Sequence, residues 1–310
     1  MALVIFLACQ DPAPSASVQP ILVFTRASLD FRGVRPSMEE LQEVIHHPGN
    51  LQEDLQKLTE DERFGWNVAL LHEPLWQTRA DDSDVSQVDF AIADESGYLR
   101  SVGEEPLQIL AWIANHDLPW TEIVRADWTV ADEVLAVWWP VDYPIGETGW
   151  KQVHYTDGRP QAGLLSSDGF WWRYTTTYNN ANRGRISQLT RILLCSDYLS
   201  RPIAFDPTLD LTDEELVKNA VQQNPSCVAC HATLDPAGAY LWGFYTEFTN
   251  DVTDWSYYHY DREDFWEDFN VPPAWQGQPG ENIEDLGRQL AADPRLIQCM
   301  VQRSFEGLLQ

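Results

Sequence analysis

The sequence predicts a mainly α-helical fold of irregular architecture, with long loops and short β-strands. Apolar residues recur at helical spacing along most of the chain, and capping residues stand in front of several of these segments. Hydrophobic residues make up 44% of the 310 positions, which is enough to bury a core without disulfide staples. A short cysteine and histidine motif at residues 227–231 places the expected chemistry in the C-terminal third.

The expected helices follow from their start signals and their apolar period. Ser37 with Glu40, and Thr59 with Glu62, have the spacing of a capping box in front of an apolar segment. Further helices are expected over residues 106–116, 185–194 and 213–223, the last capped by Thr212 and Glu215, and closing helices are expected to begin at Asn282 and at Asp293-Pro294. β-Branched and aromatic residues predict short strands in 134–141 and 170–178.

The charge balance excludes one class of partner and favours another. Asp and Glu number 48 against 20 Lys and Arg, so the formal net charge is −28. A surface this acidic repels nucleic-acid phosphates and anionic lipid head groups. We therefore expect no nucleic-acid partner, and two interpretations of the charge stay open: it attracts a basic protein partner, or it only keeps a secreted protein soluble.

The first 20 residues are expected to be an export segment and tether. An apolar run ends in Leu7-Ala8-Cys9, and a polar tract rich in Pro, Ser and Ala follows it. The run is too short to span a bilayer, but the triplet has the form of a lipobox with Cys9 as the lipidated residue. A lipid on Cys9 is the one membrane attachment expected, and it implies a periplasmic or cell-surface location.

The strongest chemical signal is the motif Cys-Val-Ala-Cys-His. On a helix, Cys227, Cys230 and His231 occupy positions i, i+3 and i+4 and project from one face. This geometry lets two thiols bond the vinyl groups of a porphyrin while the imidazole ligates its iron, and C-x-x-C-H is the attachment signature of c-type haem. Asn224 can cap such a helix, and Pro225 suits its first position. We therefore predict covalent haem c with His231 as the proximal iron ligand.

Two other interpretations of the motif fit less well. A structural zinc site needs a second Cys or His pair at short spacing, whereas the remaining cysteines stand alone at positions 9, 195 and 299. A thioredoxin-type dithiol follows a core strand, whereas this motif follows an acidic helical segment and Asn-Pro. With Cys9 lipidated and two thiols on haem, Cys195 and Cys299 remain, either as a disulfide or as two unpaired buried thiols.

Residues that follow the motif are candidates to surround the haem. Pro236 is expected to form a turn with Asp235 and Gly238 against the macrocycle. Three aromatic residues at alternating positions are candidates for the walls of the haem pocket: Tyr240, Trp242 and Phe244. The sixth iron position is left open between Met300 and His259, and core packing is the other interpretation of Met300.

The run NPSCVACHATLDPAGAYLWGF at 224–244 resembles the haem-bearing module of the planctomycete-type cytochrome-c-like proteins. In that family, C-x-x-C-H is followed by an Asp-Pro-x-Gly turn and an aromatic residue. Segments 26–41, 118–139, 163–195 and 293–309 are similar to other parts of these proteins, in the same order. The resemblance implies a mono-haem protein exported from a bacterium, and it supplies no substrate because the family is mostly of unassigned function.

Two functions remain open on the sequence. The first is one-electron transfer to a redox protein partner, since the chain has one haem motif and no second cofactor motif. The second is an exported glycan- or surface-binding protein with a structural or sensory haem, which a groove lined by Trp255, Tyr257 and Tyr258 would favour. A carrier is favoured over a hydrolase, because 48 carboxylates make paired-acid motifs uninformative. The expected regions are the export segment at 1–20, a helical region at 21–160 and the haem-bearing region at 161–310.

Overall fold

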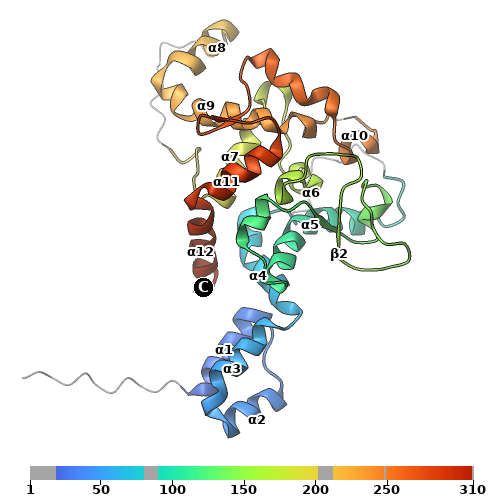
Figure 1. Cartoon of the computed structure of the whole chain (residues 1–310), viewed down its shortest axis with the longest axis vertical. Helices are drawn as coiled ribbons and strands as arrows, with labels where there is room; N and C mark the ends of the chain where they lie inside the picture. Colours follow the sequence, from blue (N-terminus) through green and yellow to red (C-terminus); the bar gives the residue numbers. More distant parts are fainter. Residues whose placement is uncertain (1–18, 80–89, 202–211, 248, 309–310) are drawn as a thin grey trace, which may run out of the picture. The chain divides into compact units, whose positions relative to one another are not determined.

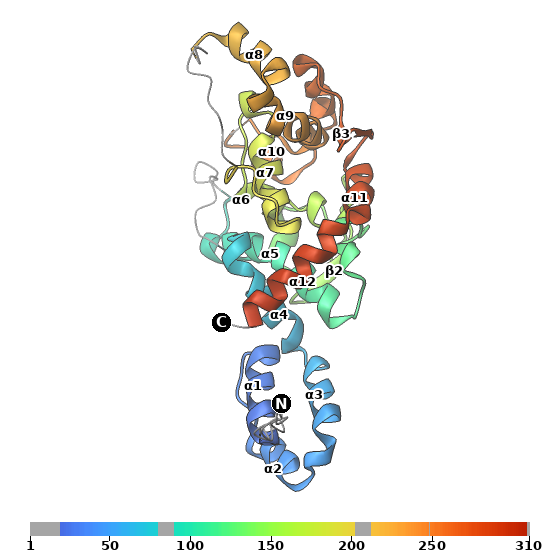
Figure 2. The ribbon, with the colours of Figure 1, turned by 90° about the vertical axis from the view of Figure 1, so that its left-hand side faces the viewer.

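The computed structural model describes residues 19–79, 90–201, 212–247 and 249–308. The chain divides into two compact units, the first ending at Phe64 and the second beginning at Gly65. Helices dominate both units, as Figures 1 and 2 show, and the strands of the described residues form two small sheets. The predicted mainly α fold is therefore confirmed. The boundary expected at residue 160 falls within the second unit.

The first unit is a small helical assembly with a core of few residues. Helix α1 (Pro20–Arg32) packs against both α2 (Met38–His46) and α3 (Leu51–Thr59), and the short 3-10 helix η1 (Pro48–Asn50) joins the last two. The fully buried apolar residues of this unit are Phe24, Val44 and Leu58. Polar residues that line the space between these helices therefore have a large share in its organisation.

The two predicted capping boxes of this region have different outcomes. The one at Ser37 is confirmed: its Oγ accepts a hydrogen bond from the Glu40 amide at 3.2 Å, and Glu40 Oε2 accepts one from the Ser37 amide at 2.7 Å. The one at Thr59 is wrong, because Thr59 is the last residue of α3. Asp61 acts instead at the start of the next helix, where its Oδ1 accepts from the Arg63 amide at 3.0 Å.

The second unit contains most of the helices and all four strands of the described chain. Its helices are, in chain order, α4 (Arg63–Trp76, which begins at the end of the first unit), α5 (Glu95–Asn115), η2 (Trp120–Val124), η3 (Leu135–Val137), η4 (Gly163–Ser166), α6 (Asp168–Arg173), η5 (Tyr178–Asn180), α7 (Arg183–Leu193), α8 (Glu214–Gln223), α9 (Pro225–Gly238), η6 (Ala239–Phe244), α10 (Val252–Ser256), η7 (Tyr260–Phe269), α11 (Ile283–Ala292) and α12 (Pro294–Leu308). Antiparallel pairs are formed by β1 (Thr129–Ala131) with β2 (Lys151–Val153), and by β3 (Ala274–Trp275) with β4 (Gln278–Pro279).

Most predicted helices of this unit are present, and one cap differs. The segment 106–116 lies in α5 and 185–194 lies in α7, each except for its last residue. Asn282 caps α11, and Pro294 begins α12, as expected. Helix α8 is capped by Asp213 rather than Thr212, since Asp213 Oδ1 accepts from the Leu216 amide at 3.1 Å. None of these described helices has the length and apolar content needed to cross a bilayer.

Both predicted strands are wrong. Residues 135–137 form η3, because Asp132 Oδ1 accepts from the Leu135 amide at 2.8 Å and starts a turn there. Residues 168–173 form α6, because the Ser167 hydroxyl caps the Phe170 amide at 3.0 Å. The two aromatic segments pack against α5 instead of pairing as strands. Helix α6 approaches α5 so closely that a Cβ on Gly169 would lie 2.2 Å from the Val102 carbonyl oxygen.

The tryptophans lie in the core or pack partly buried against it. None of the fourteen tryptophans is exposed, and Trp76, Trp171 and Trp242 are among the largest fully buried side chains. The indole N–H of Trp172 donates to the Trp255 carbonyl oxygen at 2.8 Å, which ties α6 to α10. The tryptophan content therefore reflects a core built from large rings.

Candidate functional site

The C-x-x-C-H motif lies on a helix, as the sequence predicts. Asn224 Oδ1 accepts a hydrogen bond from the Ser226 amide at 3.0 Å, and Pro225 occupies the first position of α9. The helical period therefore places Cys227, Cys230 and His231 on one face. Both cysteines are free thiols and half-buried, and Cys230 packs against the main hydrophobic core. Helix α9 itself lies against α8 and α7 (Figure 1).

The imidazole of His231 is held by a carboxylate on the same helix. Its Nδ1 lies 3.0 Å from Asp235 Oδ1 and 3.1 Å from Oδ2, and a quarter of the side chain, 25%, is exposed. Burial acts to raise the pKa of Asp235, but the hydrogen bonds from His231 and Arg183 outweigh it and lower the pKa below its usual value. An ionised carboxylate only accepts, so in the neutral form of the imidazole Nδ1 carries the proton and Nε2 has the lone pair that can bind a metal.

Arg183 completes this network from α7. Its Nε donates to Asp235 Oδ1 at 2.6 Å and its Nη2 donates to Oδ2 at 3.3 Å. The neighbouring Asn182 donates through Nδ2 to the Gly238 carbonyl oxygen at 3.2 Å, and a Cβ on Gly238 would lie 2.5 Å from the Ala181 carbonyl oxygen. Helix α9 is therefore pressed against the start of α7, and this contact brings Arg183 to the carboxylate.

The turn expected after the motif is absent. Helix α9 continues through Asp235 and Pro236 to Gly238, whose φ is −62°. Proline and the residue before it disfavour the helix locally, but the packing of α9 against α7 overrides that preference. Gly238 is needed for the close approach to α7 and not for a positive φ, and Pro236 lies inside the helix.

The three aromatic candidates do not form one wall. They lie in the 3-10 helix η6, where residues two apart point about 120° away from each other. Tyr240 donates through its hydroxyl to Gln289 Oε1 at 3.1 Å on α11. Trp242 stacks on Phe269 with ring centroids 5.5 Å apart, while Phe244 contacts the rings of Trp171 and Tyr258. All three are buried in the core.

The structure does not bring the two candidate sixth ligands to His231. Met300 lies on α12, which is separated from α9 in both Figures 1 and 2, and its sulfur accepts from the Ser304 hydroxyl at 3.7 Å. Met300 packs against the main core, as its other interpretation expects. His259 uses its Nε2 at the Asp254 carbonyl oxygen, 2.9 Å away.

The other cysteines fall into two cases. Cys195 and Cys299 are joined as a disulfide, with Cα atoms 5.3 Å apart, which links the end of α7 to α12. Cys9, the expected lipidation site, lies outside the described residues.

The residues on α9 fit a c-type haem better than a bare metal ion. Across the described ranges, no three or more His, Cys, Asp or Glu gather in a way that could hold a metal ion. A zinc ion would need such a set. A c-type haem needs only one imidazole from this helix, because the two thiols bond carbon atoms of the porphyrin and not the iron.

The groove expected for glycan binding is not formed. Trp255 is 2% exposed and Tyr258 is 8% exposed, so neither offers a ring face at the surface. Tyr257 is exposed, but the cavity that it lines with Trp255 and His259 has a volume of only about 10 Å³. This volume admits one water molecule and no sugar ring.

A second set of charges is buried around Arg159. Its Nη1 donates to Asp168 Oδ1 at 2.8 Å, and its Nε and Nη2 donate to Asp157 Oδ2 at 3.0 and 2.8 Å. Its guanidinium carbon lies 3.8 Å from the centroid of the Tyr155 ring. Burial raises the pKa of Asp168 to about 7, although Arg159 opposes the change. We call these four residues the Arg159 cluster.

Glu105 on α5 is buried beside this cluster. It accepts hydrogen bonds from the Thr129 hydroxyl at 2.5 Å and from the Ser167 hydroxyl, and burial raises its pKa to about 8. No local pattern marked either set in the sequence, since one carboxylate among 48 does not stand out. The pair of His231 with Asp235 was detectable, because residues four apart on a helix face each other.

Comparisons of the chain with protein-family models, with curated proteins and with solved structures found no match.

Proposed function

We propose that the protein is an exported c-type cytochrome with one haem, held by Cys227 and Cys230, and that it transfers single electrons. The observation that carries the proposal is the arrangement on α9: two free thiols and an imidazole on one helical face, with Nδ1 of His231 fixed by Asp235. Metal-ligating histidines commonly donate their second N–H to a carboxylate, which orients the ring and raises its basicity.

Each residue has a defined task in this function. Cys227 and Cys230 would hold the haem through thioether bonds to its two vinyl groups, each thiol hydrogen going to the other vinyl carbon, and His231 Nε2 would ligate its iron. Asp235 keeps the proton on Nδ1, and Arg183 holds Asp235 in place through Nε at 2.6 Å. Bound haem supplies a one-electron couple, and the half-buried position of both cysteines leaves an edge of the site near solvent.

The remaining features support an exported carrier. The disulfide between Cys195 and Cys299 is typical of an oxidising compartment such as the periplasm or the cell surface. A lipid on Cys9 would add a membrane anchor. The net charge of −28 would steer a basic redox partner to the surface and would keep nucleic acids away.

A spectroscopic redox titration tests electron transfer. The protein is matured in a host with a haem-attachment system and titrated between its oxidised and reduced absorption spectra. We expect one reversible one-electron transition in the wild-type protein. The control His154→Gln, which changes an exposed histidine, should show the same transition, and His231→Gly should show no single transition. If the protein carries haem but shows no such transition, covalent attachment is still supported and the electron-carrier function is overturned.

A further inference from the structure

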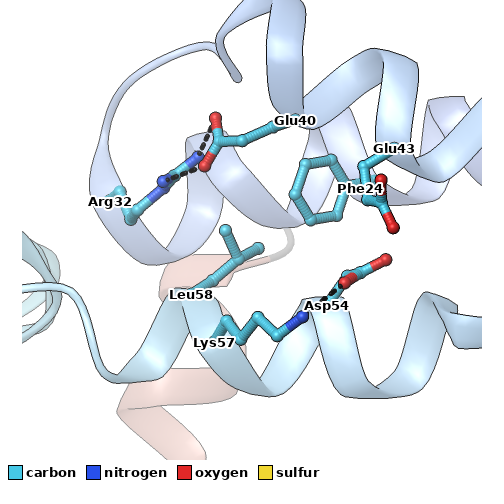
Figure 3. Close-up of a pocket in the computed structure, with 7 residues that line it drawn as sticks. All are labelled: Phe24, Arg32, Glu40, Glu43, Asp54, Lys57 and Leu58. Carbon is cyan, nitrogen blue, oxygen red and sulfur yellow. Dashed lines mark hydrogen bonds and ion pairs between the residues drawn. The ribbon is translucent and has the colours of Figure 1, made fainter.

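A pocket in the first unit lies outside the site already described. It opens between α2 and α3, with a volume of about 180 Å³, and we call it the α2–α3 pocket. Its lining residues, drawn in Figure 3, are Phe24, Arg32, Glu40, Glu43, Asp54, Lys57 and Leu58. Phe24 and Leu58 are buried and apolar, so the pocket combines an apolar base with charged walls.

Most of the charges in the pocket neutralise one another. Glu40 accepts two hydrogen bonds from the Arg32 guanidinium, at 2.7 and 3.2 Å. Lys57 Nζ donates to Asp54 Oδ1 at 3.0 Å. The lining residues hold three carboxylates against these two cations, so the pocket lacks one positive charge.

One buried carboxylate oxygen in the pocket has no hydrogen-bond partner. Asp54 is only 7% exposed, and its Oδ2 is buried with no hydrogen-bond partner. Figure 3 shows the Asp54 carboxyl group directed across the pocket toward that of Glu43. Glu43 is exposed and meets His47 Nδ1 with its Oε1 at 2.9 Å. A buried carboxylate oxygen without a partner is costly, and a cation between the two carboxyl groups would remove that cost.

The chemistry of the pocket selects an organic cation. No described group of three or more His, Cys, Asp or Glu is arranged to hold a metal ion, which argues against a divalent cation. Cavities of about 150 Å³ bind molecules of the size of benzene, so this pocket has room for a short alkyl chain. We propose that the α2–α3 pocket binds a primary alkylammonium group, with its nitrogen between Asp54 and Glu43 and its methylenes against Phe24 and Leu58.

Ligand-observed NMR on the full-length protein tests the proposal, with n-pentylamine as the probe and n-pentanol as its uncharged counterpart. We expect saturable binding of the amine at neutral pH and none of the alcohol. Asp54→Asn removes the charge at constant shape and should weaken binding about tenfold. The matched control Glu39→Gln, exposed on α2 outside the pocket, should bind as the wild type does.

A second variant, at the exposed Glu43, tests the proposal even if Asp54→Asn fails to fold. Glu43→Gln alters an exposed side chain and should weaken amine binding about threefold. Equal binding of pentanol and pentylamine, or unchanged amine binding in Glu43→Gln and in a folded Asp54→Asn, would overturn the proposal.

The same experiment distinguishes two sources of the ammonium group. Pentylamine is compared with N-acetyl-lysine methylamide, which presents the lysine side chain as a partner protein would. Similar binding of both supports a site for the ammonium group as such, and binding of the lysine derivative alone supports a site for a lysine of a basic partner. Binding of neither probe would contradict the proposal, and the result does not depend on haem.

Discussion

Among the aspartates that pair with arginines, Asp235 and Asp168 have pKa values shifted in opposite directions. The side chains of Asp235 and Arg183 are 11% and 24% exposed, whereas those of Asp168 and Arg159 are 5% and 0% exposed. The pKa of Asp235 is lowered, while burial raises that of Asp168 to about 7. An arginine partner by itself therefore does not decide whether an aspartate is ionised.

The difference shows that the balance between the cost of burial and the hydrogen bonds to the carboxylate decides the protonation of each aspartate. Around Asp235, hydrogen bonds from His231 and Arg183 exceed the cost of removing the charge from water. Around Asp168 that cost exceeds the attraction of Arg159. Asp235 is therefore suited to orient the imidazole of His231 toward a ligand. The Arg159 cluster is suited to a structural role, because Arg159 binds Asp168 on α6 and Asp157 in the loop before it.

Removal of the buried arginine should have the largest effect on stability. Arg159→Met leaves Asp157 and Asp168 without their cation, and the loss of one partner of a buried pair costs about 3–5 kcal/mol. The matched variant Arg183→Met removes the more exposed arginine and should cost about 1 kcal/mol or less. Urea unfolding of both variants measures the two losses. Equal losses would contradict the distinction by burial.

Removal of the carboxylate beside His231 should shift the reduction potential. Asp235→Asn weakens the hydrogen bond to Nδ1, makes the imidazole less basic and so favours ferrous iron. Changes to such a partner commonly alter metal affinity 10–100-fold. A loss of this size that falls on ferric iron alone corresponds to a rise of about 60–120 mV for a one-electron couple. Potentiometry of haem-loaded protein checks this, with the exposed Glu281→Gln as control. A fall in the potential of Asp235→Asn, or none, would contradict the role of Asp235.

The buried carboxyl of Glu105 should make the protein less stable as pH rises. Its pKa is about 8 in the folded protein and near 4.5 when unfolded, so the unfolded chain loses this proton first. The stabilisation is complete below about pH 4.5, and it is lost between there and about pH 8.

Glu105→Gln should remove this part of the pH dependence and stabilise the protein relative to wild type by about 1–3 kcal/mol near pH 8. Unfolding at several pH values checks it, with the exposed Glu95→Gln on the same helix as control. A wild-type stability that rises between about pH 5 and pH 8 in parallel with that of Glu105→Gln would contradict it.

Local signals predicted the helical parts of the fold and of the site. The capping box at Ser37, the cap at Asn282 and the start of α9 at Pro225 each depend on residues within one helical turn. The strands predicted at 134–141 and 170–178 were wrong because single polar groups, Asp132 and Ser167, start helical turns there.

The tertiary part of the site could not be predicted from local pattern. Arg183 reaches Asp235 across 52 positions of sequence, and that contact depends on how α7 packs against α9. The turn at Asp235-Pro236 was wrong for the same reason, because packing against α7 keeps α9 helical through the proline. The 3-10 helix η6 makes its three aromatic side chains, those of Tyr240, Trp242 and Phe244, point in different directions. The alternating aromatic pattern in the sequence does not reveal a 3-10 helix.

The intact mass of the denatured protein shows whether haem is covalently attached to α9. The wild-type chain and the double variant Cys227→Ser, Cys230→Ser are exported from a host with a haem-attachment system and then denatured. We expect the wild-type mass to equal that of the polypeptide plus one haem, and the mass of the double variant to equal that of the bare polypeptide. A colourless wild-type protein with the mass of the bare polypeptide would contradict covalent haem on α9, and with it the proposed electron transfer.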